Sequence, residues 1–288
     1  MILDPSFWLI QIFNGVSYGA LLFLLASGLT LIFGVMRIVN LAHGAYFLLG
    51  GYAALSVIGA TGSWLLALPL AALAIALVGL AMERVFLRPL GFDPLRQVLL
   101  TVGFAFLFQQ AALDIWGGDN LIIDPPAALT RSWVVGGLHL PVYRIFMIGT
   151  AVAIGLGLWL AMEKTRVGAI VRAAVDDAEM ARGVGIDTSR VSMFIFALGA
   201  FLAALGGVIG GAFLGVYPGL DFEVLPIAFA VVIIGGMGSL TGAAVGSLLV
   251  GLADNFGKAL FPELAYFSLY APMVLILAIK PTGLLGRE

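Results

Sequence analysis

The chain has 288 residues, of which 62% are hydrophobic and only 10% are charged, and its formal net charge is −2. Soluble domains carry about 25% charged residues, so this composition excludes an ordinary soluble domain and indicates a polytopic α-helical membrane protein. The absence of cysteine from the sequence excludes disulfides and thiolate chemistry.

Apolar runs of spanning length recur along the chain, with the lengths that helices need to cross a bilayer. A further apolar segment, 223–255, is broken by the sequence IIGGMGSLTGA. That break predicts either two short spans or a re-entrant pair of half-helices. We therefore expect an all-α fold with about 8–9 transmembrane helices in a single transmembrane domain, 1–288. The uninterrupted spans are expected at 7–35, 45–60, 64–86, 95–116, 143–162, 192–216 and 265–279.

Polar residues interrupt the first span and the segment after it. Gln11, Asn14 and Ser17 follow one another at helical spacing, and Asn40 and His43 lie at the next membrane boundary. Such residues either bond helices together or line a transport path. Both interpretations remain open, with Asn14, Ser17, Asn40 and His43 as the candidate path residues.

Two other polar features lie further along the chain. The stretch 117–142 contains several prolines and acidic residues, which predicts an external loop with little regular structure. Asp254 is placed inside an apolar run beside Asn255 and Lys258. We expect a capping or ion-paired role for Asp254, because no chain of buried carboxylates accompanies it as a proton relay would require.

The stretch Glu163–Val191 holds ten of the thirty acidic and basic residues. Burying ten charges at a bilayer centre would cost about 25 kcal/mol or more. This stretch therefore lies outside the lipid, and the apolar runs on either side of it are spans.

Within this stretch the spacing predicts one amphipathic helix over Val167–Arg182, stopped by Gly183 and Gly185. Asp187 or Thr188 could then cap the next helix. The apolar face comprises Val167, Ile170, Val171, Ala174, Ala178 and Ala181. Such a helix either docks into the groove of a partner or is simply a solvated helical loop.

The distribution of lysine and arginine predicts the orientation. Eleven of the fourteen fall in one set of loops, which includes 163–191 and the C-terminal segment. Positively charged loops stay in the cytoplasm. We expect the N-terminus outside, and the 163–191 loop and the C-terminus in the cytoplasm of a bacterial inner membrane.

Two common signatures of nucleotide-binding and metal-dependent enzymes are absent. The sequence has no GxxxxGK[ST] and no HExxH, and no cluster of cysteine and histidine that could hold a metal. We therefore expect no catalytic or metal site and no nucleotide bound by a P-loop of this chain.

Four segments resemble a known family. Gly28–Gly44 (GLTLIFGVMRIVNLAHG), 165–187 (TRVGAIVRAAVDDAEMARGVGID), 235–251 (GGMGSLTGAAVGSLLVG) and 280–287 (KPTGLLGR) are similar to the LivH-type permease subunits of branched-chain amino acid ABC importers. The resemblance covers roughly residues 7–287.

The resemblance implies several partners: a second permease of the LivM type, two cytoplasmic ATP-binding subunits and a periplasmic substrate-binding protein. It also implies that the amphipathic helix is the element that couples to the ATPases, through Arg172, Ala173, Asp176, Met180 and Gly185. ATP would then be bound by the partner subunits, and no cofactor by this chain.

Other cargoes remain open, because relatives of this type carry urea, amides or aromatic acids. A stand-alone secondary carrier or channel is the alternative from another class. It would transport without ATPase subunits.

Overall fold

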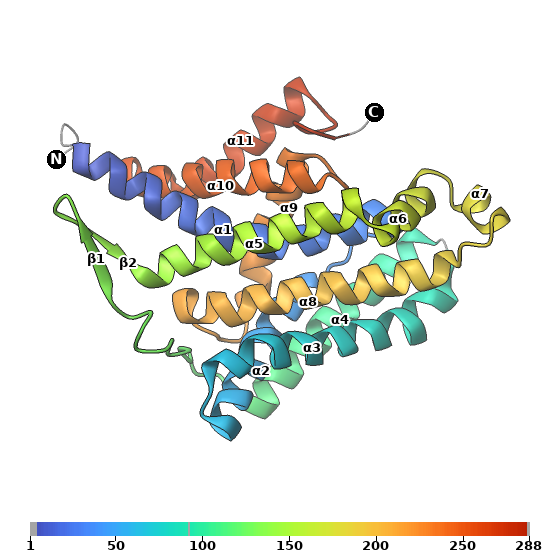
Figure 1. Cartoon of the computed structure of the whole chain (residues 1–288), viewed down its shortest axis with the longest axis horizontal. Helices are drawn as coiled ribbons and strands as arrows, with labels where there is room; N and C mark the ends of the chain where they lie inside the picture. The colour runs from blue at the N-terminus through green and yellow to red at the C-terminus, as the bar shows by residue number, and fades with distance from the viewer. Residues whose placement is uncertain (1–4, 92, 287–288) are drawn as a thin grey trace.

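A computed structural model describes residues 5–91 and 93–286, and it is an almost entirely helical bundle (Figure 1). The longer helices are α1 (Pro5–Met36), α2 (His43–Thr61), α3 (Trp64–Met82), α4 (Pro94–Trp116), α5 (Val142–Lys164), α8 (Thr188–Leu214), α9 (Leu220–Gly235), α10 (Leu240–Leu260) and α11 (Ala265–Ile279). Two short helices, α6 (Arg166–Asp176) and α7 (Ala178–Gly183), connect α5 to α8.

Seven helices in the described part of the chain are long and apolar enough to cross a bilayer: α1, α2, α3 with its continuation to Leu90, α4, α5, α8 and α10. The predicted class, a polytopic helical membrane protein, is confirmed. The remaining apolar helices, α9 with 16 residues and α11 with 15, are shorter than the ~20 residues of a full crossing.

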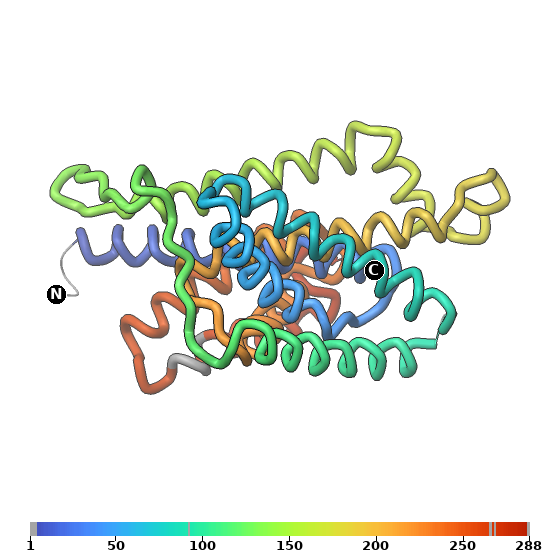
Figure 2. The backbone as a smooth tube through the Cα atoms, turned by 90° about the horizontal axis from the view of Figure 1, so that it is seen from below, coloured from blue at the N-terminus to red at the C-terminus, as the bar shows by residue number. Residues whose placement is uncertain are grey.

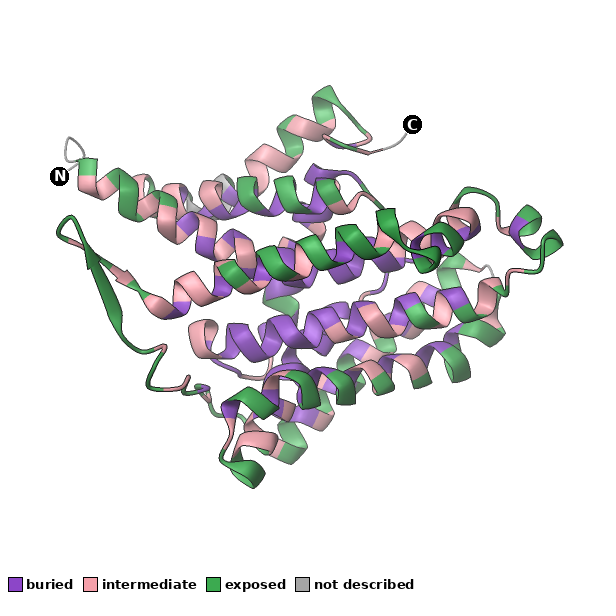
Figure 3. Cartoon of the chain, viewed as in Figure 1, coloured by how far each residue is buried: buried purple, intermediate pink, exposed green. Residues whose placement is uncertain are grey.

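Helices α1 and α8 form the centre of the bundle (Figure 3). In the most apolar window of each, 72% of the residues are buried, compared with 22% for α4 and 17% for α5. The peripheral helices therefore leave apolar side chains for lipid or another subunit, whereas α1 and α8 are enclosed by protein.

Glycines allow the central helices to approach closely. A Cβ added at Gly28 of α1 would lie 2.5 Å from the carbonyl oxygen of Gly199 of α8, and one added at Gly251 of α10 would lie 2.5 Å from the backbone nitrogen of Gly19. Small residues at helix crossings are the usual way in which membrane helices gain packing energy.

The predicted break in the late apolar segment is confirmed. Gly236–Ser239 separates α9 from α10, and Gly236 has a φ of +104°, a conformation that glycine adopts without strain. The C-terminal segment covers this break, because the backbone N–H groups of Leu284 and Leu285 donate to the carbonyls of Ile234 and Gly235, each at 2.9 Å. However, α10 has 21 residues, so it is not the half-length element that the sequence suggested.

The stretch 117–142 has more regular structure than predicted. β1 (Ser132–Val135) and β2 (Leu138–Pro141) form an antiparallel hairpin in which Ser132 pairs with Pro141 and Val135 with Leu138. The two residues between the strands are Gly136 and Gly137, both with positive φ, which is the geometry of a tight hairpin turn. The proline content of the stretch concealed this signal.

The connections gather at two opposite ends of the bundle. The N-terminus and the β1–β2 hairpin lie at one end, and the α3–α4 connection lies with α6 and α7 at the other (Figures 1 and 2). We call these the hairpin end and the coupling end, the second after the coupling role that the sequence resemblance implies for its helices. The lysine- and arginine-rich loops at 84–96 and 163–191 thus share the coupling end, as the distribution of lysine and arginine in the sequence predicted.

At the coupling end α3 changes its winding. It continues as η1 (Glu83–Leu87), a π-helical turn, and η2 (Arg88–Leu90), a 3₁₀ turn, before α4 begins. π-Turns within helices are often found at functional sites.

Candidate functional site

The inner face of α6 is anchored to the bundle. Val171 and Ala174 are buried in a cluster with Leu31 of α1, Leu158 of α5 and Val191 of α8. A displacement of α6 therefore acts directly on three long helices.

One helix cap and one side-chain hydrogen bond hold α6 against the end of α5. The side chain of Thr165 accepts a hydrogen bond from the backbone N–H of Gly168, which caps the start of α6. A guanidinium nitrogen of Arg172 donates to the carbonyl oxygen of Met162, near the end of α5. Arg172 thus ties α6 to α5 and does not reach outward as a docking residue would.

The single amphipathic helix predicted over Val167–Arg182 is wrong in one respect, because Asp177 divides it. Asp177 has extended backbone angles, and its Oδ1 accepts from the N–H groups of Glu179 and Met180 at 2.9 Å each. An aspartate that caps a following helix competes with continuation of the preceding one. The predicted cap at Asp187 is confirmed, since its Oδ1 accepts from the N–H of Arg190 at 3.1 Å.

The predicted apolar face is also only partly correct. Val171, Ala174 and Ala181 are buried, but Val167 and Ile170 are 50% and 40% exposed. Both exposed residues lie in the first half of α6, which begins directly after the extended residue Thr165.

The tip of the segment presents apolar side chains. Met180 and Val184 are 67% and 72% exposed. Asp176 and Gly185 are exposed beside them, with Gly185 at a φ of +88°, and Ala173 is half-buried. Of the five predicted coupling residues, Asp176, Met180 and Gly185 are therefore at an accessible surface, Arg172 contacts the end of α5, and Ala173 is half-buried between them.

The candidate path residues do not come together. At the hairpin end, Asn14 accepts a hydrogen bond of 2.8 Å from Arg144 of α5. Ser17 is fully buried and donates to the carbonyl oxygen of Phe13 in its own helix at 2.5 Å. These two residues thus serve one contact between helices and one contact within a helix.

Asn40 and His43 lie in the interior near the coupling end, and both are fully buried. The Oδ1 of Asn40 accepts from the N–H of Ala42 at 3.1 Å, and the Nε2 of His43 lies 2.9 Å from the carbonyl oxygen of Leu25. Asn40 thus stabilises the 37–42 loop from within, and His43 connects the start of α2 to α1.

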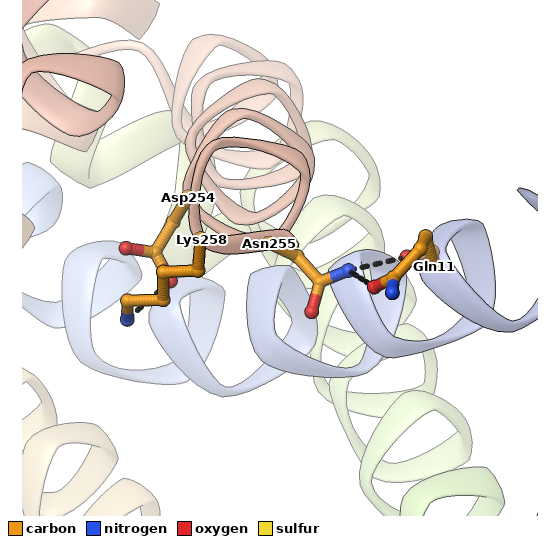
Figure 4. Close-up of polar contacts among 4 residues, drawn as sticks. All are labelled: Gln11, Asp254, Asn255 and Lys258. Carbon is orange, nitrogen blue, oxygen red and sulfur yellow. Dashed lines mark hydrogen bonds and ion pairs between the residues drawn. The ribbon is translucent and has the colours of Figure 1, made fainter. Parts of the chain in front are cut away.

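A polar contact between α1 and α10 lies near the hairpin end (Figure 4). Asn255 donates to the side-chain oxygen of Gln11 at 2.5 Å and to its backbone carbonyl at 2.9 Å. On the same helix Asp254, which is buried, pairs with the more exposed Lys258 at 2.7 Å. The expectation of a paired role for Asp254 is confirmed.

Two other polar residues at this end had no clear sequence signal. The guanidinium of Arg144 lies 4.9 Å from the ring centroid of Phe213. In the sequence, Arg144 was distinguished only by its place near the start of a span. Tyr217 donates to the carboxylate of Glu223 at 2.8 Å, and burial, together with this hydrogen bond, raises the pKa of Tyr217 to about 12. Tyr217 therefore stays protonated and remains a donor at neutral pH.

Comparison with known proteins agrees with this architecture. Residues 11–277 match the family described as branched-chain amino acid transport system, permease component. The chain is 32% identical to the high-affinity branched-chain amino acid transport system permease protein LivH of Salmonella typhimurium, over 98% of this chain and 96% of that one.

Two further relatives have the same description. Identity is 32% to LivH of Escherichia coli strain K12, over 98% of this chain and 96% of that one, and 31% to BraD of Pseudomonas aeruginosa, over 97% and 96%. No solved structure matches the chain. The match extends over all seven long apolar helices and the segment between α5 and α8, so the chain belongs to the family of permease components of branched-chain amino acid ABC transport systems.

Proposed function

We propose that this chain is one half of the pore of an importer that moves branched-chain or other neutral amino acids across the bacterial inner membrane. The observation that carries the proposal is the match to LivH-type permeases over 98% of the chain. Its partners would be a second, LivM-type permease, two ATP-binding subunits and a periplasmic substrate-binding protein.

The proposed coupling element is the segment α6–α7, with Asp176, Met180 and Gly185 on its outer surface. Met180 and Val184 would enter a groove of an ATPase subunit, since exposed apolar side chains at the tip of a short helix suit helix-in-groove recognition. Arg172 would pass the movement to α5 through its bond to Met162, and its neighbours Val171 and Ala174 would pass it to α1, α5 and α8 through the buried cluster. ATP binding and hydrolysis would then change which side of the pore is open.

The proposed orientation places the N-terminus and the hairpin outside and the coupling end in the cytoplasm. The lysines and arginines at the coupling end support this orientation. The proposal keeps a single transmembrane domain, 1–288, and the large buried cluster to which most of the long helices contribute supports it.

The proposal for the path is narrower than the sequence suggested. Asn14, held by Arg144 at the hairpin end, would contribute to the outer part of the path. Ser17, Asn40 and His43 would reach the path only in another conformation of the transport cycle, because all three are buried here.

Reconstitution tests the function. The chain, its permease partner and the ATPases would be placed in proteoliposomes with the binding protein, and uptake of labelled leucine, urea and phenylalanine would be compared. We expect leucine uptake that requires both ATP and the binding protein. Uptake by this chain alone would identify a carrier instead, and uptake confined to urea or phenylalanine would contradict the proposed cargo.

The coupling assignment has its own test. Met180→Asp with Val184→Asp should weaken co-purification of the ATPase subunits about tenfold or more, because a buried apolar contact would be lost. Val135→Asp is the matched control, since Val135 is 58% exposed at the opposite end. Unchanged assembly in the Met180 and Val184 variant would reject the assignment.

A further inference from the structure

A cavity of about 200 Å³ separates the coupling segment from the bundle. One wall comes from the coupling side and includes Ala174, Ala178 and Arg182. The opposite wall comes from the end of α1, the η1–η2 turns and the start of α4, and includes Met36, Glu83 and Gln97. Ala178 and Arg182 of α7 therefore border an unfilled space, and Ala174 of α6, which also packs in the buried cluster, lies at its edge.

The wall of this cavity contains a buried acidic side chain, Glu83. It is only 2% exposed, and its Oε2 has no hydrogen-bond partner among the residues that the structure describes. It is the first residue of the π-turn, where the backbone N–H of Arg88 bonds to the carbonyl of Glu83. A buried carboxylate oxygen without a partner is costly, which makes Glu83 a candidate for an ion pair in another state.

Arg182 is the cation on the opposite wall. Its Nε donates to the carbonyl of Ala178 in its own helix at 3.1 Å, and the described residues provide no ion pair for it. Arg88 also lines the cavity, but it follows Glu83 by one π-turn of the same helix end. A movement of α7 would therefore change the distance from Glu83 to Arg182 and leave Arg88 where it is.

We infer that Glu83 is a positioning residue for coupling, which receives Arg182 when α7 moves into the cavity during the transport cycle. The inference rests on the proposed function, because it needs an ATPase to move the segment. The ion pair would exist in one state only, and such a contact biases an equilibrium between two conformations. The cavity supplies the room for the movement, and burial strengthens the pair once it forms.

The first test uses charge at Arg182, whose exposed position makes substitutions tolerable for folding. In the complete reconstituted complex, Arg182→Gln should lower the amino acid moved per ATP hydrolysed by about fivefold or more, and Arg182→Lys should retain most of it. Glu83→Gln should act like Arg182→Gln, and the double variant should be no worse than either single variant. Arg190→Gln is the control, because Arg190 pairs with Asp187 on the surface.

The second test measures proximity directly. The sequence has no cysteine, so the pair Glu83→Cys and Arg182→Cys provides the only two thiols in this chain. We expect the two thiols to crosslink in one nucleotide state of the complex and not in the other, in cysteine-free partners. Equal crosslinking in all states, or full coupling in Arg182→Gln, would overturn the inference. A wild-type complex that hydrolyses ATP without moving any cargo would instead refute the proposed function.

Discussion

The crossing of α1 with α8 and the segment α6–α7 are built in opposite ways. At the crossing, Gly28 and Gly199 bring two backbones into contact, and the surrounding side chains are almost all buried. In the coupling segment, short helices are held by side-chain caps, apolar side chains at the tip are exposed, and a cavity lies underneath. The comparison indicates a rigid body with one adjustable attachment, which is what a protein moved by another protein's ATP hydrolysis needs.

The largest expected effect lies at the crossing. Gly28→Val would place its Cβ 2.5 Å from the Gly199 carbonyl, which neither backbone can avoid without separating the helices. We expect most of the folded protein to be lost, as judged by size-exclusion chromatography and thermal unfolding in detergent, because overpacking costs about 1–3 kcal/mol or more. Gly157→Val on α5, where no atom lies within 4 Å, is the control and should remain folded.

A smaller effect is expected at the edge of the rigid body. Lys258→Met would leave the buried carboxylate of Asp254 unpaired and should cost about 1–3 kcal/mol. Adding Asp254→Asn should recover part of this loss in unfolding measurements. The matched control is Arg96→Met, whose pair with Asp93 is exposed and should contribute little. Equal losses in Lys258→Met and Arg96→Met would contradict a buried pair.

The contact between α1 and α10 should contribute less again. Asn255→Leu removes the hydrogen bonds to Gln11, and bonds of this kind between membrane helices contribute about 0.6–1.7 kcal/mol each. Thermal unfolding of the purified chain measures the difference. Gln110→Leu is the control, because the hydrogen bond of Gln110 is to Asp114, one turn further along the exposed face of the same helix. A larger loss of stability in Gln110→Leu than in Asn255→Leu would contradict a stabilising contact between α1 and α10.

The smallest and most local effect concerns the coupling segment. Asp177→Ala removes the cap of α7, which should cost about 1 kcal/mol locally and leave the bundle intact. Hydrogen exchange should become faster over 178–183 and remain unchanged in α1. Asp187→Ala, which removes the cap of α8, should affect the first turn of α8 instead. Unaltered exchange in α7 would mean that the cap does not hold it.

Much of the fold was predictable because apolar length alone defines a membrane span. The predicted 64–86 and 95–116 spans agree closely with α3 and α4, and the glycine-rich break before α10 was visible as a run of small residues. The β1–β2 hairpin was missed because its strands are only four residues each. The division of the coupling helix was missed because Asp177 fits a helical pattern as well as it fits a cap.

The candidate site was less predictable, because it depends on which way side chains point. Arg172 has the charge and spacing of a docking residue, yet it bonds to the end of α5. Asn40 and His43 have the polarity of path residues, yet Asn40 bonds within its own loop and His43 contacts a carbonyl of α1. Glu83 could not be distinguished from an ordinary charge at the end of a span until its burial beside a cavity was known.

The most direct test of the central claim is the side of the membrane on which the coupling segment lies. Single-cysteine variants at Met180 and at Val135, two exposed positions at opposite ends of a chain without cysteine, can be labelled in intact cells with a maleimide that does not cross membranes. We expect Val135→Cys to react from outside, and Met180→Cys to react only after permeabilisation and to be protected by the ATPase subunits. Labelling of Met180→Cys from outside intact cells would contradict the account.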